Sequence, residues 1–418
     1  MKKTYQRILA ILAAVAIVVG LAACNNGKNN QPDTDPSGDV IVRVGFVYPK
    51  TGDLASFGEY TEEWTKYVVD QANELGITID GKKAKISLIT ADSMSDPKEA
   101  RQAARQLIKE KNIDIMITSK TADTTVPVSE ICEKEGIVCL SVDTPDEAWA
   151  VNTHKYSFHA GFDIASELNC FMAAWAQIDT NMRVGVMHPN DSEGSTMINV
   201  IPDYIKAQGY TAYDPGAYLP GQQDFTNVIR NLKTQQVEVL AGVMTNADFA
   251  TFYKQLEESG YLENIKVITV AKTALFKKDI EALDVEGLCT EIWWDDTFPT
   301  KSSLDGKTSA QIKEEFTRLT GQDHASAAVG YDYANIEILY AVLNAAGSLD
   351  ANKLIAAAEK LDLDTVIGKV KFNARHYSVQ PLAEGQWVVG SNGDWTREII
   401  SAGSVEGLQV TASLRALR

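Results

Sequence analysis

Few residues of this 418-residue chain have the types and spacing that catalysis requires. The five histidines show no H-E-x-x-H or similar metal-binding spacing. The sequence also contains no G-x-S-x-G nucleophile motif, no G-x-G-x-x-G motif and no G-x-x-x-x-G-K-[ST] phosphate loop. Cys132 and Cys139 could act as nucleophiles, but no histidine stands close to them in the sequence. We therefore expect neither an enzyme nor a metal or cofactor site.

Cys24 stands at the end of an export signal. Residues 1–24 combine a basic start, an uncharged apolar run of 13 residues from Ile8 to Gly20, and the sequence Leu-Ala-Ala-Cys. This order is typical of a secretory signal, and the run is too short to span a membrane, which takes about 20 residues. The last four residues resemble a bacterial lipobox, which implies cleavage before Cys24 and attachment of a diacylglyceryl group to its thiol. We expect residues 1–23 to be the signal peptide, and the mature protein to lie outside the cytoplasm, at the cell surface or in the periplasm, held to the membrane by lipid alone.

Composition sets the next limits. Residues 25–39 contain no aliphatic or aromatic side chain and are rich in Asn, Asp, Pro and Gly, so we expect residues 24–39 to form a disordered tether. The whole chain carries a formal charge of −17, and the mature chain would carry about −20 once the basic start is removed. No basic stripe with interleaved aromatic residues is present, so nucleic acid is not an expected partner.

The other four cysteines are even in number, which permits disulfides in an exported protein. Cys132 lies on a predicted helix that turns at Gly136 into the predicted strand that holds Cys139. We predict a disulfide between these two residues. Two buried free thiols remain the alternative.

Apolar strands and amphipathic helices alternate along most of the chain from Val40 onward. The alternation restarts after an irregular stretch at residues 142–162, and the end of the chain is β-rich, with a hairpin turn signal at residues 391–394. Two successive series of this kind predict the α/β class, with two doubly wound parallel-sheet lobes.

Four segments, taken in order and spacing, carry a resemblance to a known family. They are VGFVYPKTGDLASFGEY at residues 44–60, ADSMSDPKEARQAARQLI at residues 91–108, DFTNVIRNLKTQQVEVL at residues 224–240 and TVIGKVKFNARHYSVQP at residues 365–381. The chain resembles the branched-chain amino-acid (Leu/Ile/Val) binding proteins, which are type I periplasmic substrate-binding proteins of ABC importers. The resemblance implies a small-molecule ligand, and ABC permease and ATPase subunits as partners. A ligand sensor that signals to a membrane receptor remains the alternative.

The same resemblance implies a domain plan. Two lobes are joined by hinge strands, with a ligand cleft at the carboxyl ends of the parallel strands. Lobe 1 is expected at residues 40–161 plus 289–364, and lobe 2 at residues 162–288 plus 365–395. Residues 396–418 would form a last strand and a tail.

Ligand-binding residues are implied on both sides of the cleft. On lobe 1 they are Phe57, Lys120, Thr121, Ala122, Asp143 and Thr144. On lobe 2 they are Glu193, Met244, Thr245 and Lys272. Lys120 and Lys272 are included because each loop follows the carboxyl end of a predicted strand, and a solvated loop lysine is the alternative for both. A carboxylate in the first turn of a helix is the alternative for Glu193, and the cap of a local turn is the alternative for Asp143. Trp294 is expected to form an aromatic wall, and its neighbour Trp293 to face the core, because adjacent residues on a strand point to opposite faces.

One position departs from the amino-acid binders. Those proteins place an acidic residue beside the ligand's ammonium group, because a buried ammonium without an acidic partner is costly. The corresponding position here is Ala271, followed by Lys272. We therefore expect an organic acid without an α-amino group as the ligand. An amino acid is the alternative, if Asp143 or Glu193 supplies the missing acid.

Overall fold

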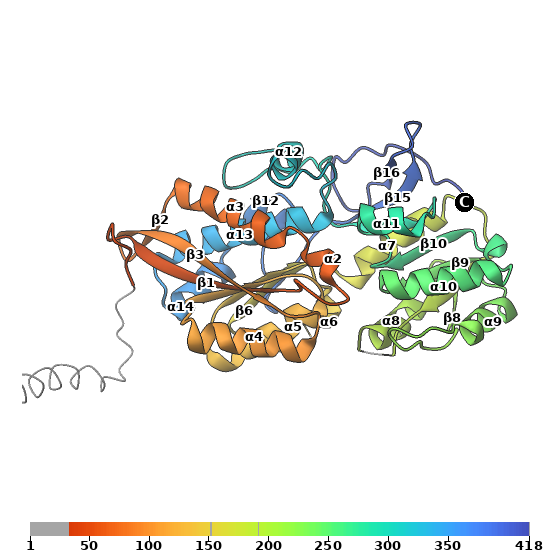
Figure 1. Cartoon of the computed structure of the whole chain (residues 1–418), viewed down its shortest axis with the longest axis horizontal. Helices are drawn as coiled ribbons and strands as arrows, with labels where there is room; N and C mark the ends of the chain where they lie inside the picture. Colours follow the sequence, from red (N-terminus) through yellow and green to blue (C-terminus); the bar gives the residue numbers. More distant parts are fainter. Residues whose placement is uncertain (1–32, 151–152, 191, 418) are drawn as a thin grey trace, which may run out of the picture.

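The computed structural model of the chain describes residues 33–150, 153–190 and 192–417 (Figure 1). The predicted signal peptide, Cys24 and the first part of the predicted tether lie outside these residues. Within the described part, no helix is long and apolar enough to cross a membrane. Residues 33–39, expected in the disordered tether, instead form a turn. The Asp35 carboxylate accepts hydrogen bonds from the backbone N–H groups of Ser37 (2.8 Å) and Asp39 (3.0 Å), so residues 33–39 are folded, contrary to the prediction for this part of the tether.

Lobe 1 is built on a seven-stranded sheet in the order β14-β6-β5-β4-β1-β3-β2. Its strands are β1 (Val40–Tyr48), β2 (Ile77–Ile79), β3 (Lys82–Asp92), β4 (Ile115–Thr118), β5 (Cys139–Val142), β6 (Ser157–Gly161) and β14 (Tyr377–Val379). All neighbours are parallel except β2, which is antiparallel to β3. The central strands are almost uniformly apolar because helices cover both faces of the sheet.

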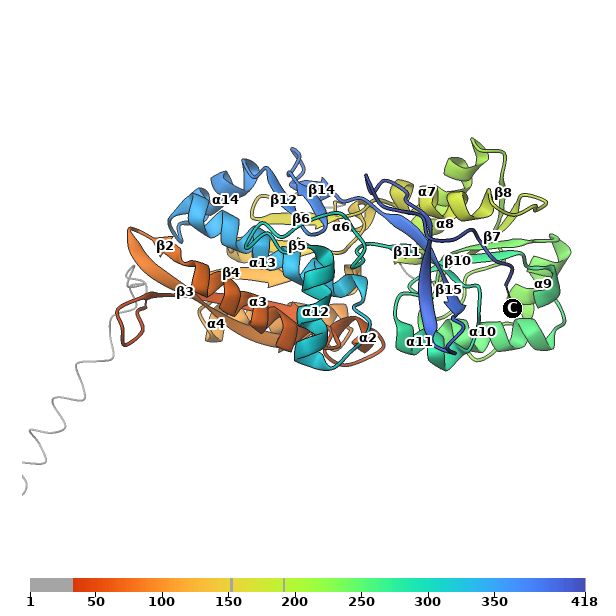
Figure 2. The same ribbon diagram turned by 90° about the horizontal axis from the view of Figure 1, so that it is seen from above.

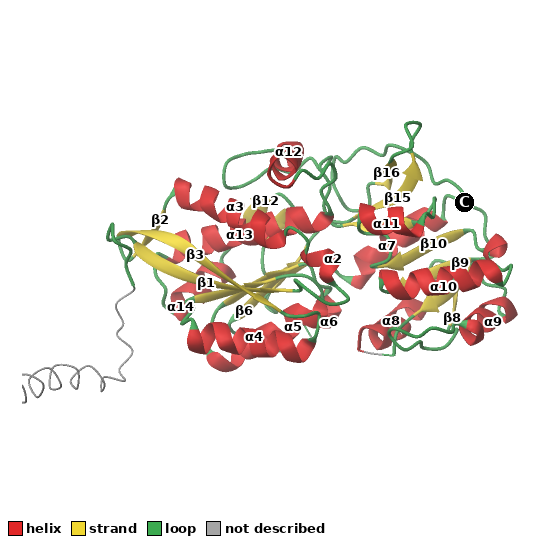
Figure 3. Ribbon diagram, viewed as in Figure 1, coloured by secondary structure: helices red, strands yellow, loops and turns green. Residues whose placement is uncertain are grey.

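The helices of lobe 1 form two layers (Figure 3). One layer contains α3 (Thr61–Leu75), α12 (Ser309–Thr320), α13 (Ala327–Ala346) and α14 (Ala351–Glu359), and the other contains α4 (Pro97–Glu110) and α5 (Ala122–Glu135). Two short helices, α2 (Ala55–Gly58) and α6 (Asp146–Trp149), follow the carboxyl ends of β1 and β5. The strands β12 (Leu363–Thr365) and β13 (Gly368–Val370) form a small antiparallel pair.

Lobe 2 is built on a parallel four-stranded sheet in the order β10-β9-β7-β8. The strands are β7 (Arg183–Met187), β8 (Thr211–Tyr213), β9 (Val239–Val243) and β10 (Val267–Ala271). One face packs against α7 (Ile164–Trp175) and α8 (Ser192–Lys206), and the other against α9 (Thr226–Thr234) and α10 (Asn246–Glu258). A short 3₁₀ helix, η1 (Leu262–Asn264), and α11 (Lys277–Leu283) flank β10.

A third, antiparallel sheet forms the hinge between the lobes (Figure 2). Its strands are β11 (Cys289–Ile292), β15 (Ala383–Val389) and β16 (Trp395–Ser401), in the order β11-β15-β16. The chain passes between the lobes after β6, after β11 and before β15. The predicted fold class, two α/β lobes joined by hinge strands, is confirmed.

One predicted lobe limit is wrong. Residues 365–381 were assigned to lobe 2, but β14 pairs with β6 in the lobe 1 sheet. Val366, Ile367 and Val370 are fully buried in the apolar cluster of lobe 1. The segment is retained by lobe 1 because its apolar side chains pack against that core before the chain crosses to β15. The final residues extend along both lobes, with Leu408 packed on lobe 1 and Leu417 on lobe 2.

The predicted disulfide is absent from the described structure, in which Cys132 and Cys139 are free and buried. Both belong to the apolar cluster between α4, α5 and the lobe 1 sheet. Burial, together with the adjacent Cys139, raises the pKa of the Cys132 thiol well above its usual value. The two residues are therefore neighbouring core thiols, as the alternative interpretation held.

Candidate functional site

A cavity of about 330 Å³ lies where the two lobes meet, and we call it the interlobe cavity. Lobe 1 lines it with the loop after β1 and with α2, and lobe 2 with the start of α10, the loop after β10 and α11. Phe57, Thr245 and Lys272, which were predicted as ligand-binding residues, all line it. The carboxyl ends of β1, β9 and β10 thus bring residues far apart in sequence to one cavity, as open α/β sheets do at their ligand sites.

Aromatic side chains join the lobes beside this cavity. The ring of Phe57 on lobe 1 makes an edge contact with Phe276 from the loop before α11, at 4.8 Å between centroids. Trp293 stacks on Phe57 at 6.2 Å and on Phe162 at 5.1 Å. All four rings are buried. Phe57 therefore packs where the lobes meet, and its contact with a ligand stays a prediction.

Trp293, rather than Trp294, is the tryptophan at the cleft. Trp294 is fully buried, and a Cβ atom added to Gly330 of α13 would lie 2.2 Å from its ring. Both tryptophans follow the end of β11 and belong to the apolar cluster of lobe 1, so the predicted aromatic wall at Trp294 is wrong, and Trp293 is the one that packs on the cavity residue Phe57. The reason is that the close approach of α13, permitted by Gly330, creates a core slot for Trp294.

Lys120 points into lobe 1 instead of toward the cleft. Its fully buried ammonium lies 2.6 Å from Asp332 Oδ1 on α13 and 3.7 Å from Asp143 Oδ2. The same Asp332 carboxylate accepts hydrogen bonds from Thr61 Oγ1 (3.0 Å) and Ser119 Oγ (3.3 Å). Lys120 is thus part of a buried ion cluster, because a buried ammonium needs acidic partners and α13 supplies one.

The loops after β4 and β5 place several buried polar atoms together. Asp143 Oδ2, Thr121 Oγ1, Thr144 Oγ1 and the Tyr331 hydroxyl have no hydrogen-bond partner among the described residues. Burial is the main cause that raises the pKa of Asp143 to about 7. Burial also raises the pKa of the Tyr331 hydroxyl, and the charge of Asp143 adds to that increase. Buried polar groups are ordinarily paired, so these atoms have unused capacity to bind a polar ligand. Ala122, the first residue of α5, is half-buried beside them.

Non-glycine residues adopt left-handed backbone conformations where these loops begin. The φ angles are +73° at Lys120, +68° at Thr121, +65° at Asp143 and +68° at Lys272. Each residue lies within a few positions of the carboxyl end of a strand. Such conformations cost of order 1–3 kcal/mol for a non-glycine residue, and they are concentrated at functional sites. Of these four residues, Lys272 lines the interlobe cavity, whereas Lys120, Thr121 and Asp143 are not among its lining residues.

Lys272 and Glu193 form an ion pair within lobe 2. The ammonium lies 2.5 Å from Glu193 Oε2, and both side chains are largely buried. Lys272 lines the interlobe cavity, as expected for a cleft residue. However, its charge is already balanced by Glu193, so it is not the uncompensated cation that the organic-acid hypothesis assumed.

The two predicted residues that follow β9 have different environments. Met244 is fully buried in the lobe 2 core, so its assignment to the cleft is wrong. Thr245 lines the interlobe cavity and caps α10, where its hydroxyl accepts a hydrogen bond from the N–H of Asp248 (3.3 Å). The difference follows from the strand geometry, because consecutive residues at a strand end point to opposite faces.

Asn246 and Asp279 are cavity residues that the sequence analysis missed. Asn246 Nδ2 donates to Asp279 Oδ2 (2.5 Å), and Ser56 Oγ donates to Asp279 Oδ1 across the cleft (3.4 Å). Burial raises the pKa of Asp279. The position of Asn246 after a strand end was a usable signal. Asp279 on α11 had none, because its place in the cleft depends on how α11 docks against lobe 1.

Three buried glutamates occupy the hinge. Glu291 on β11, Glu384 on β15 and Glu167 in the first turn of α7 are each at most 2% exposed. Glu291 and Glu384 are direct partners in the antiparallel ladder. Burial raises the pKa of Glu291 to about 7, and those of Glu167 and Glu384 well above the usual value. The negative charge of Glu291 raises the pKa values of Glu167 and Glu384 further.

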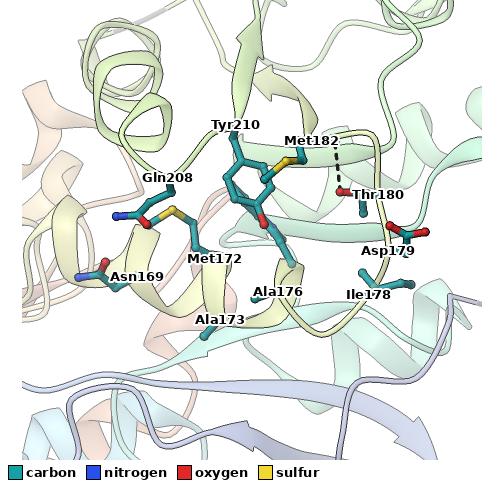
Figure 4. Close-up of a pocket in the computed structure, with 11 residues that line it drawn as sticks. Asn169, Met172, Ala173, Ala176, Ile178, Asp179, Thr180, Met182, Gln208 and Tyr210 are labelled. Atoms are coloured by element: carbon teal, nitrogen blue, oxygen red, sulfur yellow. Dashed lines mark hydrogen bonds between the residues drawn. The ribbon is translucent and has the colours of Figure 1, made fainter.

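A larger cavity, of about 620 Å³, lies on lobe 2 away from the cleft (Figure 4). It opens between α7 and the segment around Tyr210, and none of the predicted site residues lines it.

Among residues 33–150, 153–190 and 192–417 there is also no group of three or more His, Cys, Asp or Glu residues placed to hold a metal ion. The interlobe cavity is therefore the candidate ligand site.

Comparisons with known proteins agree with this architecture. Residues 41–394 match the family described as periplasmic binding protein. The Leu/Ile/Val-binding protein BraC3 of Rhizobium johnstonii is 22% identical over 342 residues, which cover 81% of this chain and 89% of the relative. The isoleucine-bound substrate-binding protein LivJ of Streptococcus pneumoniae superposes with a TM-score of 0.67 at 16% identity, covering 86% of this chain and 99% of LivJ. A solute-binding protein of Rhodopseudomonas palustris, solved with 3,4-dihydroxybenzoic acid, gives 0.70 at 15% identity, with coverage of 88% and 99%.

Proposed function

Since the chain belongs to the periplasmic binding protein family, we propose that it captures a small ligand outside the cytoplasm and delivers it to the permease and ATPase subunits of an ABC importer. Members of this family are binding proteins rather than enzymes. The observation that carries the proposal is the interlobe cavity, which residues of both lobes line. Anchoring through a lipid on Cys24 is part of the same proposal, and it rests on the sequence alone.

Lobe closure supplies the mechanism. A ligand in the interlobe cavity contacts α2 on lobe 1 and α10 and α11 on lobe 2 at the same time. When the lobes separate about the β11-β15-β16 hinge, one set of these contacts is lost. The ligand therefore binds the closed state more tightly, and this difference in affinity is the free energy that favours closure. The permease can then distinguish loaded from empty protein by its shape.

An amino acid is the ligand class that we favour. Asp143 Oδ2, which lies 3.7 Å from the Lys120 ammonium, and the hydroxyls of Thr121, Thr144 and Tyr331 have no hydrogen-bond partner among the described residues, so they can bind an ammonium and a carboxylate group between them. The ion pair between Lys272 and Glu193 leaves no net positive charge there to hold a lone carboxylate. Asp143 thus replaces the acidic partner that position 271 lacks.

An organic acid is the second candidate. Lys272 lines the cavity, and a ligand carboxylate could compete with Glu193 for its ammonium. A structure of the same fold holds 3,4-dihydroxybenzoic acid. The two candidates differ at the α-carbon of the ligand: an amino acid carries an ammonium group there, and the organic acid has no amino group there.

A thermal-shift screen of the purified mature chain tests the proposal. The set should contain the twenty amino acids, the 2-oxo acids of leucine, isoleucine and valine, and hydroxybenzoates. A ligand at a hundred times its Kd stabilises the folded state by about 2.7 kcal/mol, which is readily measured. Binding of an amino acid, with loss of affinity in Asp143→Asn, is the expected result. Importer and sensor functions are then separated by the uptake of the labelled ligand in cells that lack the gene. Retained uptake would contradict the importer role.

A further inference from the structure

We propose that the ligand carries a basic group, an ammonium or a guanidinium, at the end remote from its α-carbon, and that this group binds beside Asp279. This inference rests on the proposed function, since it names the ligand class for the same cleft. It differs from the aliphatic side chains that the names of the relatives imply.

The charged lining of the cavity is predominantly negative. Asp53 and Asp279 contribute two carboxylates, and Lys272 is the only cation among the described lining residues. Glu193 already balances Lys272 at 2.5 Å. Lys278, the cation next to Asp279 in sequence, forms an ion pair with Glu59 of lobe 1. The carboxylate of Asp279 therefore has no ion-pair partner of its own among the described residues.

Asp279 is held in position to meet a cation. Asn246 Nδ2 from lobe 2 donates a hydrogen bond to Asp279 Oδ2 (2.5 Å), and Ser56 Oγ from lobe 1 donates one to Asp279 Oδ1 (3.4 Å). These two bonds leave lone pairs on both oxygens free, because a carboxylate can accept about four hydrogen bonds. Asn246 Oδ1 is buried and has no partner within the part of the chain that the structure describes. Two kinds of acceptor, a carboxylate and an amide oxygen, thus lie side by side.

The remaining walls suit a methylene chain. Leu54, Phe57 and Leu283 present apolar surface to the cavity, and Ala250 and Ala282 are small enough to leave room. Basic side chains commonly bury their methylene stems against apolar surface while the charged end meets a polar partner. A purely aliphatic side chain would fill the same space, but it would remove water from Asp279 without replacing its hydrogen bonds, which is costly.

Isothermal titration of the mature protein with lysine and norleucine tests this inference, because norleucine has the same carbon chain without the terminal ammonium. Arginine and leucine extend the comparison. We expect lysine or arginine to bind at least about tenfold more tightly than norleucine. Asp279→Asn should reduce that affinity about tenfold and leave the affinity for norleucine unchanged. Asp179→Asn, at an exposed lobe 2 carboxylate outside the cleft, is the matched control and should behave as wild type.

Asp53→Asn provides a second variant, because Asp53 is exposed and its loss does not threaten folding. It should weaken the binding of the basic ligand less than Asp279→Asn does, since its carboxylate is hydrated. Tight binding of leucine or norleucine with no preference for lysine or arginine would overturn this inference and leave the proposed function intact. No response to any amino acid or organic acid would overturn both.

Discussion

Glu291 and Glu384 lie directly opposite each other in the antiparallel pair of hinge strands β11 and β15. Side chains at such positions share one face of the sheet, with Cβ atoms about 5 Å apart. Both residues are buried, and neither oxygen of Glu384 has a hydrogen-bond partner in the described residues. Two carboxylates this close in a dry environment cannot both be ionised cheaply, so the hinge retains protons at neutral pH.

Stability should therefore decrease as pH rises through the range in which these carboxyls titrate. The pKa of Glu291 is raised from 4.5 to about 7, so the folded state binds more protons than the unfolded state between these values. Its contribution to stability is largest below pH 4.5 and is lost as pH rises to about 7. Glu291→Gln should have a higher melting temperature than wild type at pH 8, with a smaller difference at pH 5. Equal differences at both pH values would show that Glu291 is not the titrating group.

The buried ion cluster of lobe 1 should be sensitive to loss of its cation. Lys120→Met removes the ammonium that lies 2.6 Å from Asp332 Oδ1, and it leaves that carboxylate buried in the core. Loss of one member of a buried ion pair costs about 3–5 kcal/mol, so denaturant unfolding should show a decrease of this size. Lys98→Met, at an exposed position on α4, is the matched control and should change stability little. A small effect of Lys120→Met would mean that Asp332 becomes protonated without penalty.

The two adjacent tryptophans should separate ligand affinity from stability. Trp294→Ala removes a fully buried ring packed on Gly330 and should cost about 3–5 kcal/mol, with ligand affinity retained. Trp293→Ala removes the ring that stacks on Phe57 at the cleft and should weaken ligand binding about tenfold. Titration calorimetry and urea unfolding of both variants measure the two effects. Weaker binding in Trp294→Ala alone would support the original assignment.

Periodicity along the chain predicted the fold because strand and helix patterns are local. Two apolar βα series were enough to predict two α/β lobes. The sheet that a short strand joins is a non-local property, and for this reason β14 was assigned to the wrong lobe. Similarly, the two-residue strand period does not apply to Trp293 and Trp294, because β11 ends at Ile292, and the burial of Trp294 is decided by the approach of α13.

The charges of the site were the hardest feature to predict. Lys120 and Lys272 are visible in the sequence as cations after strands, but their acidic partners are remote. Asp332 is 212 residues from Lys120, and Glu193 is 79 residues from Lys272. A lysine in a cleft loop is a ligand cation only when no carboxylate neutralises it, and that condition depends on tertiary packing. Phe57 and Thr245 were named from the family resemblance, and both line the interlobe cavity.

The thiols provide a direct chemical test of the core. Cys132 and Cys139 are buried free cysteines, as are Cys170 and Cys289. Protein unfolded in guanidinium chloride without reductant should react with a thiol reagent at all four residues. The native protein should be labelled slowly, because all four thiols are buried, and burial also raises the pKa of Cys132, Cys170 and Cys289. Protection of Cys132 and Cys139 in the unfolded, unreduced protein would restore the disulfide.

Lipid attachment at Cys24 is the prediction that concerns the location of the protein at the membrane. The residue follows Leu-Ala-Ala after an apolar run of 13 residues, and residues 25–32 separate it from the described chain. Cys24→Ser should prevent acylation and release the protein from the membrane fraction, because the proposed lipid anchor is attached to the Cys24 thiol. Cys289→Ser, at a buried core thiol, is the matched control and should stay with the membrane. A Cys24→Ser variant that sediments with membranes as fully as wild type would show that another segment anchors the protein.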